Sequence, residues 1–201
     1  FDVNIGGNHA GNPGSYYPPY KKVPLEASTD DKYLTELIMD KTLDFVKTTN
    51  KKPFFLYYSP YAVHTPIQPV KSLLSKYHNK PLWNGQNNPQ YATMVENLDI
   101  QIGRLVTELR ELNILENTFI LFSSDNGGVY TITKQRPLRA GKGSYYEGGI
   151  REPMFAFWYN KIKAGTKSDY PISNLDFYPT ILEAAGINTP MDKVLDGQSI
   201  L

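Results

Sequence analysis

Residues 91–128 have the sequence YATMVENLDIQIGRLVTELRELNILENTFILFSSDNGG, in which a helical pattern leads into a strand pattern. In the first part, apolar residues recur every three or four positions opposite charged ones, which is typical of an amphipathic helix. Residues 118–123 form a short apolar and aromatic run, which predicts a buried strand. The Asn-Gly pair at 126–127 favours a turn after it. The apolar helix positions are Met94, Val95, Leu98, Ile102, Leu105, Val106, Leu109 and Leu112.

Two further helices are predicted on either side of this stretch. Residues 28–50 place Leu34, Leu37, Ile38, Phe45 and Val46 on one helical face, and Ser28 and Asp31 have the spacing of a capping box. Residues 176–185 form the second helix, and Gly186 suits the position just after its end.

Strands and loops complete the pattern. Short apolar runs at 54–59 and 153–158 predict two more strands. Residues 1–27 are rich in Gly, Asn, Pro and Tyr and predict a long loop, while 67–90 predict an irregular segment with a helical turn near 70–77. The order of elements predicts an α/β fold with a mixed, largely parallel sheet flanked by helices.

Composition limits the function classes. The chain has 201 residues, of which 40% are hydrophobic and 20% charged, as in a globular protein. It has no Cys, which excludes disulfides, thiolate metal sites and a cysteine nucleophile within these residues. Its net charge of +1 creates no broad field for nucleic acid, so an anion site must be local. No apolar run approaches the roughly 20 residues of a membrane helix.

The first two chemical clusters follow predicted strands, where α/β sheets bind their ligands. His64, in Val63-His64-Thr65-Pro66, could act as an acid or base near neutral pH, or be a loop histidine bonded to backbone. Asp125 and Asn126 offer the oxygen ligands that Ca²⁺ or Mg²⁺ favours, or form only an Asn-Gly turn. Two oxygens are too few for a calcium site, so further ligands would have to come from elsewhere.

The third cluster is the glycine-rich stretch 138–153. Its glycines let backbone approach a ligand, and Lys142 offers a compact positive charge; the alternative is a solvated loop. The stretch lacks the spacing of a phosphate-binding or dinucleotide-binding loop. Taken together, His64, Lys142 and the Asp125-Asn126 pair fit hydrolysis of an anionic ester, with a metal on one oxygen.

These clusters occur in an order that resembles the sulfatase family, the arylsulfatase-like branch of the alkaline-phosphatase superfamily. The resemblance spans residues 52–58, His64-Thr65-Pro66, residues 124–127, the Gly-Lys-Gly to Arg-Glu-Pro block at 141–153, and residues 175–180. It implies an alkaline-phosphatase-like α/β fold and a sulfuric ester hydrolase activity.

The resemblance also implies roles for individual residues. Asp125 and Asn126 would supply half the ligands of a divalent cation, usually Ca²⁺, with Mg²⁺ possible. Lys142 would contact the sulfate and the leaving oxygen, and His64 would bind the ester oxygen and help protonate the leaving group. Arg139 is a further candidate substrate contact.

The sequence departs from the family pattern at the nucleophile. Sulfatases carry a [CS]-x-P-S-R motif whose Cys or Ser becomes formylglycine, and this chain lacks the motif and the early acidic pair of the metal site. We therefore expect residues 1–201 to be part of a catalytic domain, with a loop-rich lead-in at 1–27 and an α/β part at 28–201. The nucleophile-bearing part and a C-terminal subdomain would lie outside it, and the chain alone would be inactive.

Other functions remain open at this point. A phosphodiesterase or phosphonate hydrolase of the same superfamily could use the same residues, and so could a non-catalytic module that binds sulfated glycans through Lys142, Arg139 and Arg151. The expected partner is a sulfated small molecule or glycan, with no nucleic acid and no transmembrane segment. Self-association through surfaces exposed by truncation is also expected. The resemblance suggests a periplasmic or extracellular location.

Overall fold

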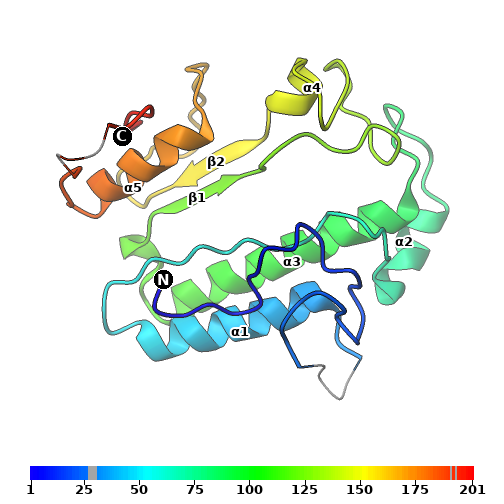
Figure 1. Ribbon diagram of the computed structural model, residues 1–201, viewed down its shortest axis with the longest axis horizontal. Coiled ribbons are helices and arrows are strands. Elements are labelled where there is room, and N and C mark those ends of the chain that lie inside the picture. The colour runs from blue at the N-terminus through cyan, green and yellow to red at the C-terminus, as the bar shows by residue number, and fades with distance from the viewer. Residues whose placement is uncertain (27–30, 191, 193) are drawn as a thin grey trace. The chain divides into compact units, whose positions relative to one another are not determined.

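The computed structural model describes residues 1–26, 31–190, 192 and 194–201, and the chain divides into two compact units (Figure 1). The first unit contains residues 1–115 and 127–150, and the second contains 116–126 and 151–201. No helix among the described residues is long and apolar enough to cross a membrane.

The first unit is built on two long helices, α1 (Leu34–Thr49) and α3 (Pro89–Glu111), which pack against each other. Both were predicted. The predicted cap of α1 at Ser28 lies outside the described residues, and the residue that caps it, Tyr33, makes no side-chain cap bond. The short helices η1 (Lys71–Leu73) and α2 (Leu74–His78) confirm the predicted helical turn.

Polar side chains join α1 to α3. Asn97 donates to Glu36 at 2.8 Å, and Arg104 pairs with Asp40 at 2.7 Å. The position after Met94, Val95, was predicted on the apolar face but is 45% exposed, whereas Asn97 is buried. Periodicity locates a helix but does not say which face meets the neighbour. Here the Asn97 amide nitrogen is buried against an acceptor on Glu36, while its Oδ1 atom has no partner among the described residues.

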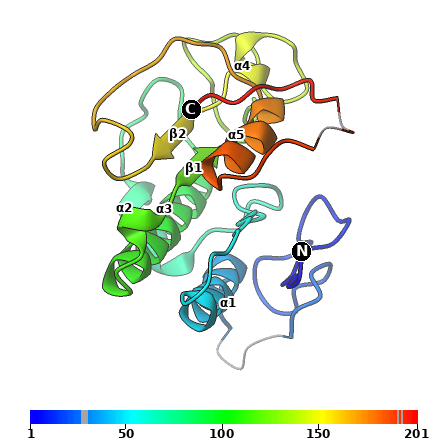
Figure 2. The same ribbon diagram turned by 90° about the vertical axis from the view of Figure 1, so that its left-hand side faces the viewer.

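The lead-in loop covers α1 and supplies part of the core, in agreement with the loop predicted for 1–27. Tyr16, Tyr20 and Val23 are buried, and the Tyr16 ring stacks on the Tyr33 ring at 5.3 Å between centroids. In Figure 2 this dark-blue loop lies beside the cyan-blue α1. The loop therefore packs as core rather than trailing in solvent.

Residues 54–59 do not form the predicted paired strand. Side-chain burial alternates along them: Phe54 packs on Phe45 of α1, while Phe55 and Tyr57 are exposed and stack on Phe1. This alternation is that of an extended segment with one covered face. A strand also needs a hydrogen-bonded neighbour, and the described residues place none beside this segment.

The second unit contains both strands of the described sheet, β1 (Ile120–Ser123) and β2 (Met154–Phe157). They pair antiparallel, from Ile120 opposite Phe157 to Ser123 opposite Met154. The sequence predicted a mixed sheet in which most strands are parallel, so this pair is one of its antiparallel members. A 3-10 turn, η3 (Asn174–Asp176), leads into α5 (Phe177–Ala184), and Gly186, with φ +67°, ends it as predicted. A further turn, η2 (Leu115–Asn117), spans the boundary along the chain at which the first unit ends and the second begins.

Candidate active site

His64 lies half-buried in a tightly bonded loop of the first unit. Its backbone N–H donates to the Tyr61 carbonyl at 2.9 Å. Both ring contacts are made by Nδ1, which lies 3.1 Å from the Thr65 carbonyl oxygen and 3.2 Å from the Thr65 hydroxyl. These contacts therefore hold the ring through Nδ1 rather than Nε2.

Tyr16 fixes this loop from the lead-in segment. Its buried hydroxyl shares its one proton between the carbonyl oxygens of Tyr61 at 2.7 Å and His64 at 2.9 Å. Burial raises the pKa of Tyr16, with the His64 bond acting weakly the other way, so the hydroxyl keeps its proton near neutral pH. The position of His64 therefore depends on a residue 48 positions earlier in the chain.

Lys142 is exposed, and its backbone is fixed by the turn at Gly127-Gly128. Its N–H donates to the Gly128 carbonyl at 3.0 Å, and the Gly127 N–H donates to the Gly149 carbonyl at 3.2 Å. The loop closes on itself through Gly148, which donates to Arg139 at 2.9 Å just after α4 (Glu147–Ile150) begins. Gly128 comes two residues after Asn126, so the predicted metal pair runs directly into the turn that holds Lys142.

The glycines of this loop are required by close backbone contacts. A Cβ at Gly148 would overlap the carbonyl oxygens of Ala140 and Arg139, and one at Gly127 would overlap that of Gly148. Only a residue without a side chain lets these backbone segments approach so closely.

Arg139, the further predicted substrate contact, is exposed and stacks on a tyrosine of the same loop. Its guanidinium carbon lies 3.7 Å from the centroid of the Tyr146 ring. Stacking orients the planar guanidinium while leaving its N–H donors at the rim of the ring.

Asp125 and Asn126 follow β1 in the second unit, and Glu152 precedes β2 opposite them. The Ser124 N–H donates to the Pro153 carbonyl at 3.3 Å, which continues the β1–β2 register by one pair. Burial, and then the neighbouring Asp125 carboxylate, raise the pKa of Glu152. The Glu152 Oε1 atom is buried and has no hydrogen-bond partner among the described residues.

This donor set suits a hard cation. Carboxylate and amide oxygens are the ligands that Ca²⁺ and Mg²⁺ take, and an orphan carboxylate oxygen beside Asp125 is in keeping with a positive charge there. The described residues nevertheless contain no group of three or more His, Asp or Glu side chains arranged to hold a metal. A complete site would need ligands from elsewhere.

The predicted site residues divide between the two units. His64, Arg139 and Lys142 belong to the first, and Asp125 and Asn126 to the second. Sequence reasoning did not assign Glu152 to the site, because its place two residues before β2 gains a meaning only once the β1–β2 pairing is known. In an antiparallel pair, that position faces the residue two places after β1, which is Asp125.

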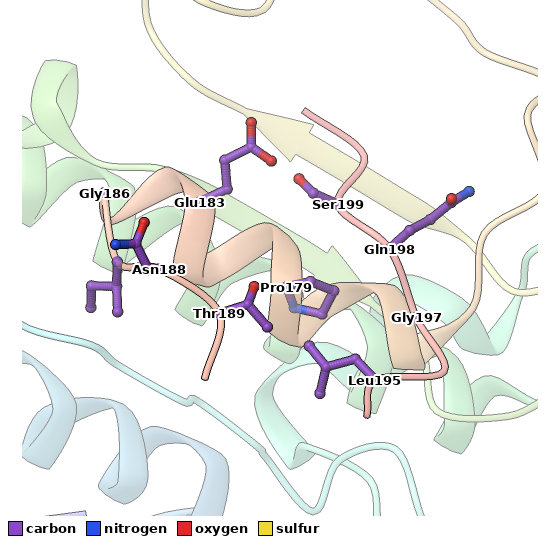
Figure 3. Close-up of a pocket in the computed structure, with 10 residues that line it drawn as sticks. Pro179, Glu183, Gly186, Asn188, Thr189, Leu195, Gly197, Gln198 and Ser199 are labelled. Atoms are coloured by element: carbon purple, nitrogen blue, oxygen red, sulfur yellow. The ribbon is translucent and has the colours of Figure 1, made fainter. Parts of the chain in front are cut away.

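A pocket of about 520 Å³ in the second unit does not fit an anionic substrate. It lies between α5 and the chain's last described residues, with Pro179, Thr189 and Leu195 toward its interior (Figure 3). Among its described lining residues, Glu183 carries a charge. This negative charge would repel a sulfate or phosphate ester.

Several curated proteins that are similar in sequence to this chain are sulfatases. N-acetylgalactosamine-6-sulfatase of Canis lupus familiaris is 33% identical over 189 residues, covering 90% of this chain and 34% of that protein. A sulfatase of Formosa agariphila is 38% identical over 183 residues, covering 84% and 33%. The chain therefore spans about a third of the length of these relatives.

Solved structures agree. The crystal structure of Ps i-CgsB in complex with k-i-k-neocarrahexaose superposes with a TM-score of 0.82 at 33% identity, covering 97% of this chain and 47% of that one. The PsFucS1 sulfatase from Pseudoalteromonas sp. superposes with a TM-score of 0.71 at 30% identity, covering 87% and 34%. These neighbours confirm the expected alkaline-phosphatase-like α/β class. Because the Sulfatase family model matches residues 2–187, the chain belongs to the sulfatase family.

Proposed function

We propose that the protein carrying this chain hydrolyses sulfate esters, with His64, Lys142 and Arg139 around the ester and Asp125 and Asn126 on a divalent cation. The observation that carries this proposal is the bond from the Lys142 N–H to the Gly128 carbonyl at 3.0 Å. It fixes the backbone of the anion-binding lysine to the turn that directly follows the Asp-Asn pair.

His64 acts on the leaving group. As an imidazolium it donates through Nδ1 to the Thr65 carbonyl, which leaves the Nε2 proton for the ester oxygen that departs. Imidazole is the side chain that most often serves as a general acid in enzymes. The hydrogen bond from the Tyr16 hydroxyl to the His64 carbonyl holds the backbone of His64 in place during the transfer.

Lys142 and Arg139 supply positive charge to the sulfate oxygens. The ammonium of Lys142 is a compact charge on an exposed stem, while the stacked Arg139 offers paired N–H donors in one plane. A cation held by Asp125 and Asn126, with Glu152 beside them, would stabilise negative charge on an ester oxygen.

The nucleophile comes from outside these residues in this proposal. The chain has no Cys and no [CS]-x-P-S-R motif, so the formylglycine typical of the family would be supplied by another part of the protein. The 201 residues alone would then hydrolyse no sulfate ester.

The substrate is a sulfated sugar in this proposal. Support comes from relatives whose names or titles refer to sugars, N-acetylgalactosamine-6-sulfatase and the neocarrahexaose complex. The Tyr146 ring, which Arg139 stacks on in the same loop as Lys142, is in keeping with a sugar ring next to the sulfate.

The test is hydrolysis of an aryl sulfate by the complete protein, with an aryl phosphate assayed in parallel. Replacing His64 or Lys142 by alanine should lower kcat/KM by about 10²–10⁴-fold, the usual effect of losing an acid–base or charge-stabilising group. His78→Ala and Lys51→Ala are the matched controls, because both side chains are exposed and lie in other segments. Faster phosphate than sulfate hydrolysis, or full activity of His64→Ala, would contradict the proposal.

The metal is tested separately from the reaction. Calcium binding by the complete protein, measured by calorimetry after chelator treatment, should weaken at least about tenfold in Asp125→Asn, because a hard cation loses a charged ligand. Asp169→Asn, an exposed acid elsewhere in the second unit, serves as the control. Equal calcium affinity of Asp125→Asn and the unaltered protein would remove Asp125 from the metal site.

A further inference from the structure

Positive charge is concentrated in two segments of a chain that is otherwise nearly neutral. Residues 79–95 and 126–146 contain no Asp or Glu, yet they carry Lys80, Lys134, Arg136, Arg139 and Lys142. The whole chain has a net charge of only +1. These segments therefore form a local basic region, and a long anion would be attracted there rather than to the molecule as a whole.

Side-chain hydrogen bonds join the two segments into one surface. The Gln86 amide donates to the Lys134 carbonyl at 2.5 Å and accepts from the Thr133 hydroxyl at 2.9 Å. Asn84 donates to the Arg136 carbonyl at 3.1 Å. In Figure 1 the teal loop after α2 lies beside the yellow-green loop that precedes α4, and both belong to the first unit.

Aromatic rings lie among these charges. Trp83 is 75% exposed at the tip of the first loop, where its carbonyl accepts from the Gln86 N–H at 2.8 Å. The Lys134 ammonium lies 3.8 Å from the centroid of the Tyr130 ring, and Arg139 stacks on Tyr146. We call this set the basic–aromatic surface: Trp83, Tyr130, Lys134, Arg136, Arg139 and Tyr146.

We propose that the basic–aromatic surface binds a sulfated polysaccharide, holding sugar units beyond the one that carries the reacting sulfate. Sugar rings present apolar C–H faces that pack on exposed aromatic rings such as Trp83. Their sulfate groups pair with Lys and Arg side chains, as carboxylates and phosphates do. A ligand with rings and repeated anionic groups matches both features of the surface.

Continuity with the proposed ester site favours a glycan over other polyanions. Arg139 belongs to the surface and to the loop of Lys142, whose backbone closes through the bond from Gly148 to Arg139. A chain of sulfated sugars could therefore occupy both at once. To this extent the inference rests on the proposed sulfatase function.

Direct binding tests the surface without any turnover. The complete protein is titrated with dextran sulfate, with unsulfated dextran and with single-stranded DNA of equal charge. Dextran sulfate should bind with a strong salt dependence, and Trp83→Ala or the pair Lys134→Gln/Arg136→Gln should weaken that binding about tenfold each, as losing one stacking platform or two charge contacts would. Lys51→Gln/Lys52→Gln removes the same charge from another exposed segment and should change binding less than twofold.

Kinetics separate the surface from the ester site. With a sulfated oligosaccharide as substrate, Trp83→Ala should raise KM about tenfold and leave kcat nearly unchanged, because the lost contact binds ground state and transition state alike. With a small aryl sulfate, which cannot reach the surface, kcat/KM should stay within about twofold. Arg136→Glu, which reverses an exposed charge, should give the larger KM effect of the single variants.

Specific results overturn the proposal. Binding of unsulfated dextran equal to that of dextran sulfate, or unchanged binding by the Trp83 and Lys134/Arg136 variants, would remove the surface from glycan recognition. DNA binding as tight as dextran sulfate binding, lost in the same variants, would assign the surface to nucleic acid instead. Variant-sensitive dextran sulfate binding by a protein without sulfate ester hydrolysis would support the surface and reject the proposed function.

Discussion

The helix pair α1–α3 and the loop 127–149 hold their shapes by different means. In the helix pair, side chains make the contact: Met94 is fully buried, and charged groups such as Asp40 and Arg104 bond across the seam. In the loop, backbone meets backbone, and Gly148 sits where a Cβ would overlap two carbonyl oxygens. Side-chain volume and charge therefore hold the helix pair together, whereas the shape of the loop depends on glycine having no side chain.

This difference predicts how each region tolerates change. A packed seam between helices can relax around a smaller side chain at a graded energetic cost. A loop closed by backbone contacts has no flexible atom that can move aside, so a single added methyl group must shift the chain. The loop also carries Lys142 and Arg139, so such a shift should lower the rate of ester hydrolysis.

Gly148→Ala should have the largest effect. The new Cβ displaces the backbone of Arg139 and Ala140, and a shift of about 1 Å in a catalytic loop can lower activity about 100-fold. Aryl sulfate turnover by the complete protein measures it, with circular dichroism as the check on folding. Turnover above half that of the unaltered protein would contradict the prediction, because it would mean that the loop backbone can move aside without loss of activity.

Met94→Ala should lower the free energy of unfolding by about 3 kcal/mol, because it removes a fully buried side chain and leaves a cavity. Urea unfolding of the complete protein is the measurement. The adjacent Val95→Ala is the matched control: Val95 is 45% exposed, so its change should stay within about 0.5 kcal/mol. Equal losses for both variants would contradict the assignment of Met94 to the core.

Asp40→Asn should lower stability by about 1 kcal/mol or less, since its ion pairs with Lys32 and Arg104 are partly open to solvent. Burial raises the pKa of Asp40, but hydrogen bonds from Lys32 and Arg104 outweigh burial and hold the pKa below its ordinary value. The carboxylate therefore stabilises the fold above the ordinary aspartate pKa, and this contribution is lost as the pH falls through the lowered pKa. The difference between Asp40→Asn and the unaltered protein should accordingly be larger at pH 6 than at pH 3, and a pH-independent difference would contradict the ion-pair account.

Gly103→Ala should have the smallest effect and the opposite sign. Gly103 lies within α3 with nothing near the position of an added Cβ, so alanine should stabilise the helix by roughly 0.5–1 kcal/mol. The same substitution is thus expected to stabilise the helix at Gly103 and to lower activity in the loop at Gly148. A loss of stability at Gly103 would show that the two glycines differ less than the structure indicates.

Much of the fold could be predicted from periodicity, and the failures have physical causes. The apolar spacing from Met94 to Leu109 located α3, and Gly186 correctly marked the end of α5. The run 54–59 has strand composition but is unpaired in the described residues, because pairing depends on a neighbour that no local pattern contains. The burial of Asn97 on α3 was not predicted for a related reason. Its hydrogen-bond partner, Glu36, lies on another helix, and no local pattern around Asn97 indicates it.

The candidate site was predictable as motifs but not as contacts. The sequence indicated His64, Lys142, Arg139, Asp125 and Asn126 from residue chemistry and family resemblance, and their roles remain predictions. It could not indicate Glu152, because the facing of Asp125 and Glu152 follows from the β1–β2 register. The link from Gln86 to Lys134 likewise spans 48 positions and has no signature in the local sequence.

The Tyr16 hydroxyl changes how variants of this protein should be interpreted. A substitution at residue 16 removes no group that could touch a substrate, yet it frees the two carbonyls that hold the His64 loop. An activity screen would record such a variant as a catalytic defect, while a map of the substrate contacts would record it as harmless. Pairing Tyr16→Phe with a probe of the His64 ring, such as its NMR titration, would identify the change as a lost anchor in the lead-in loop.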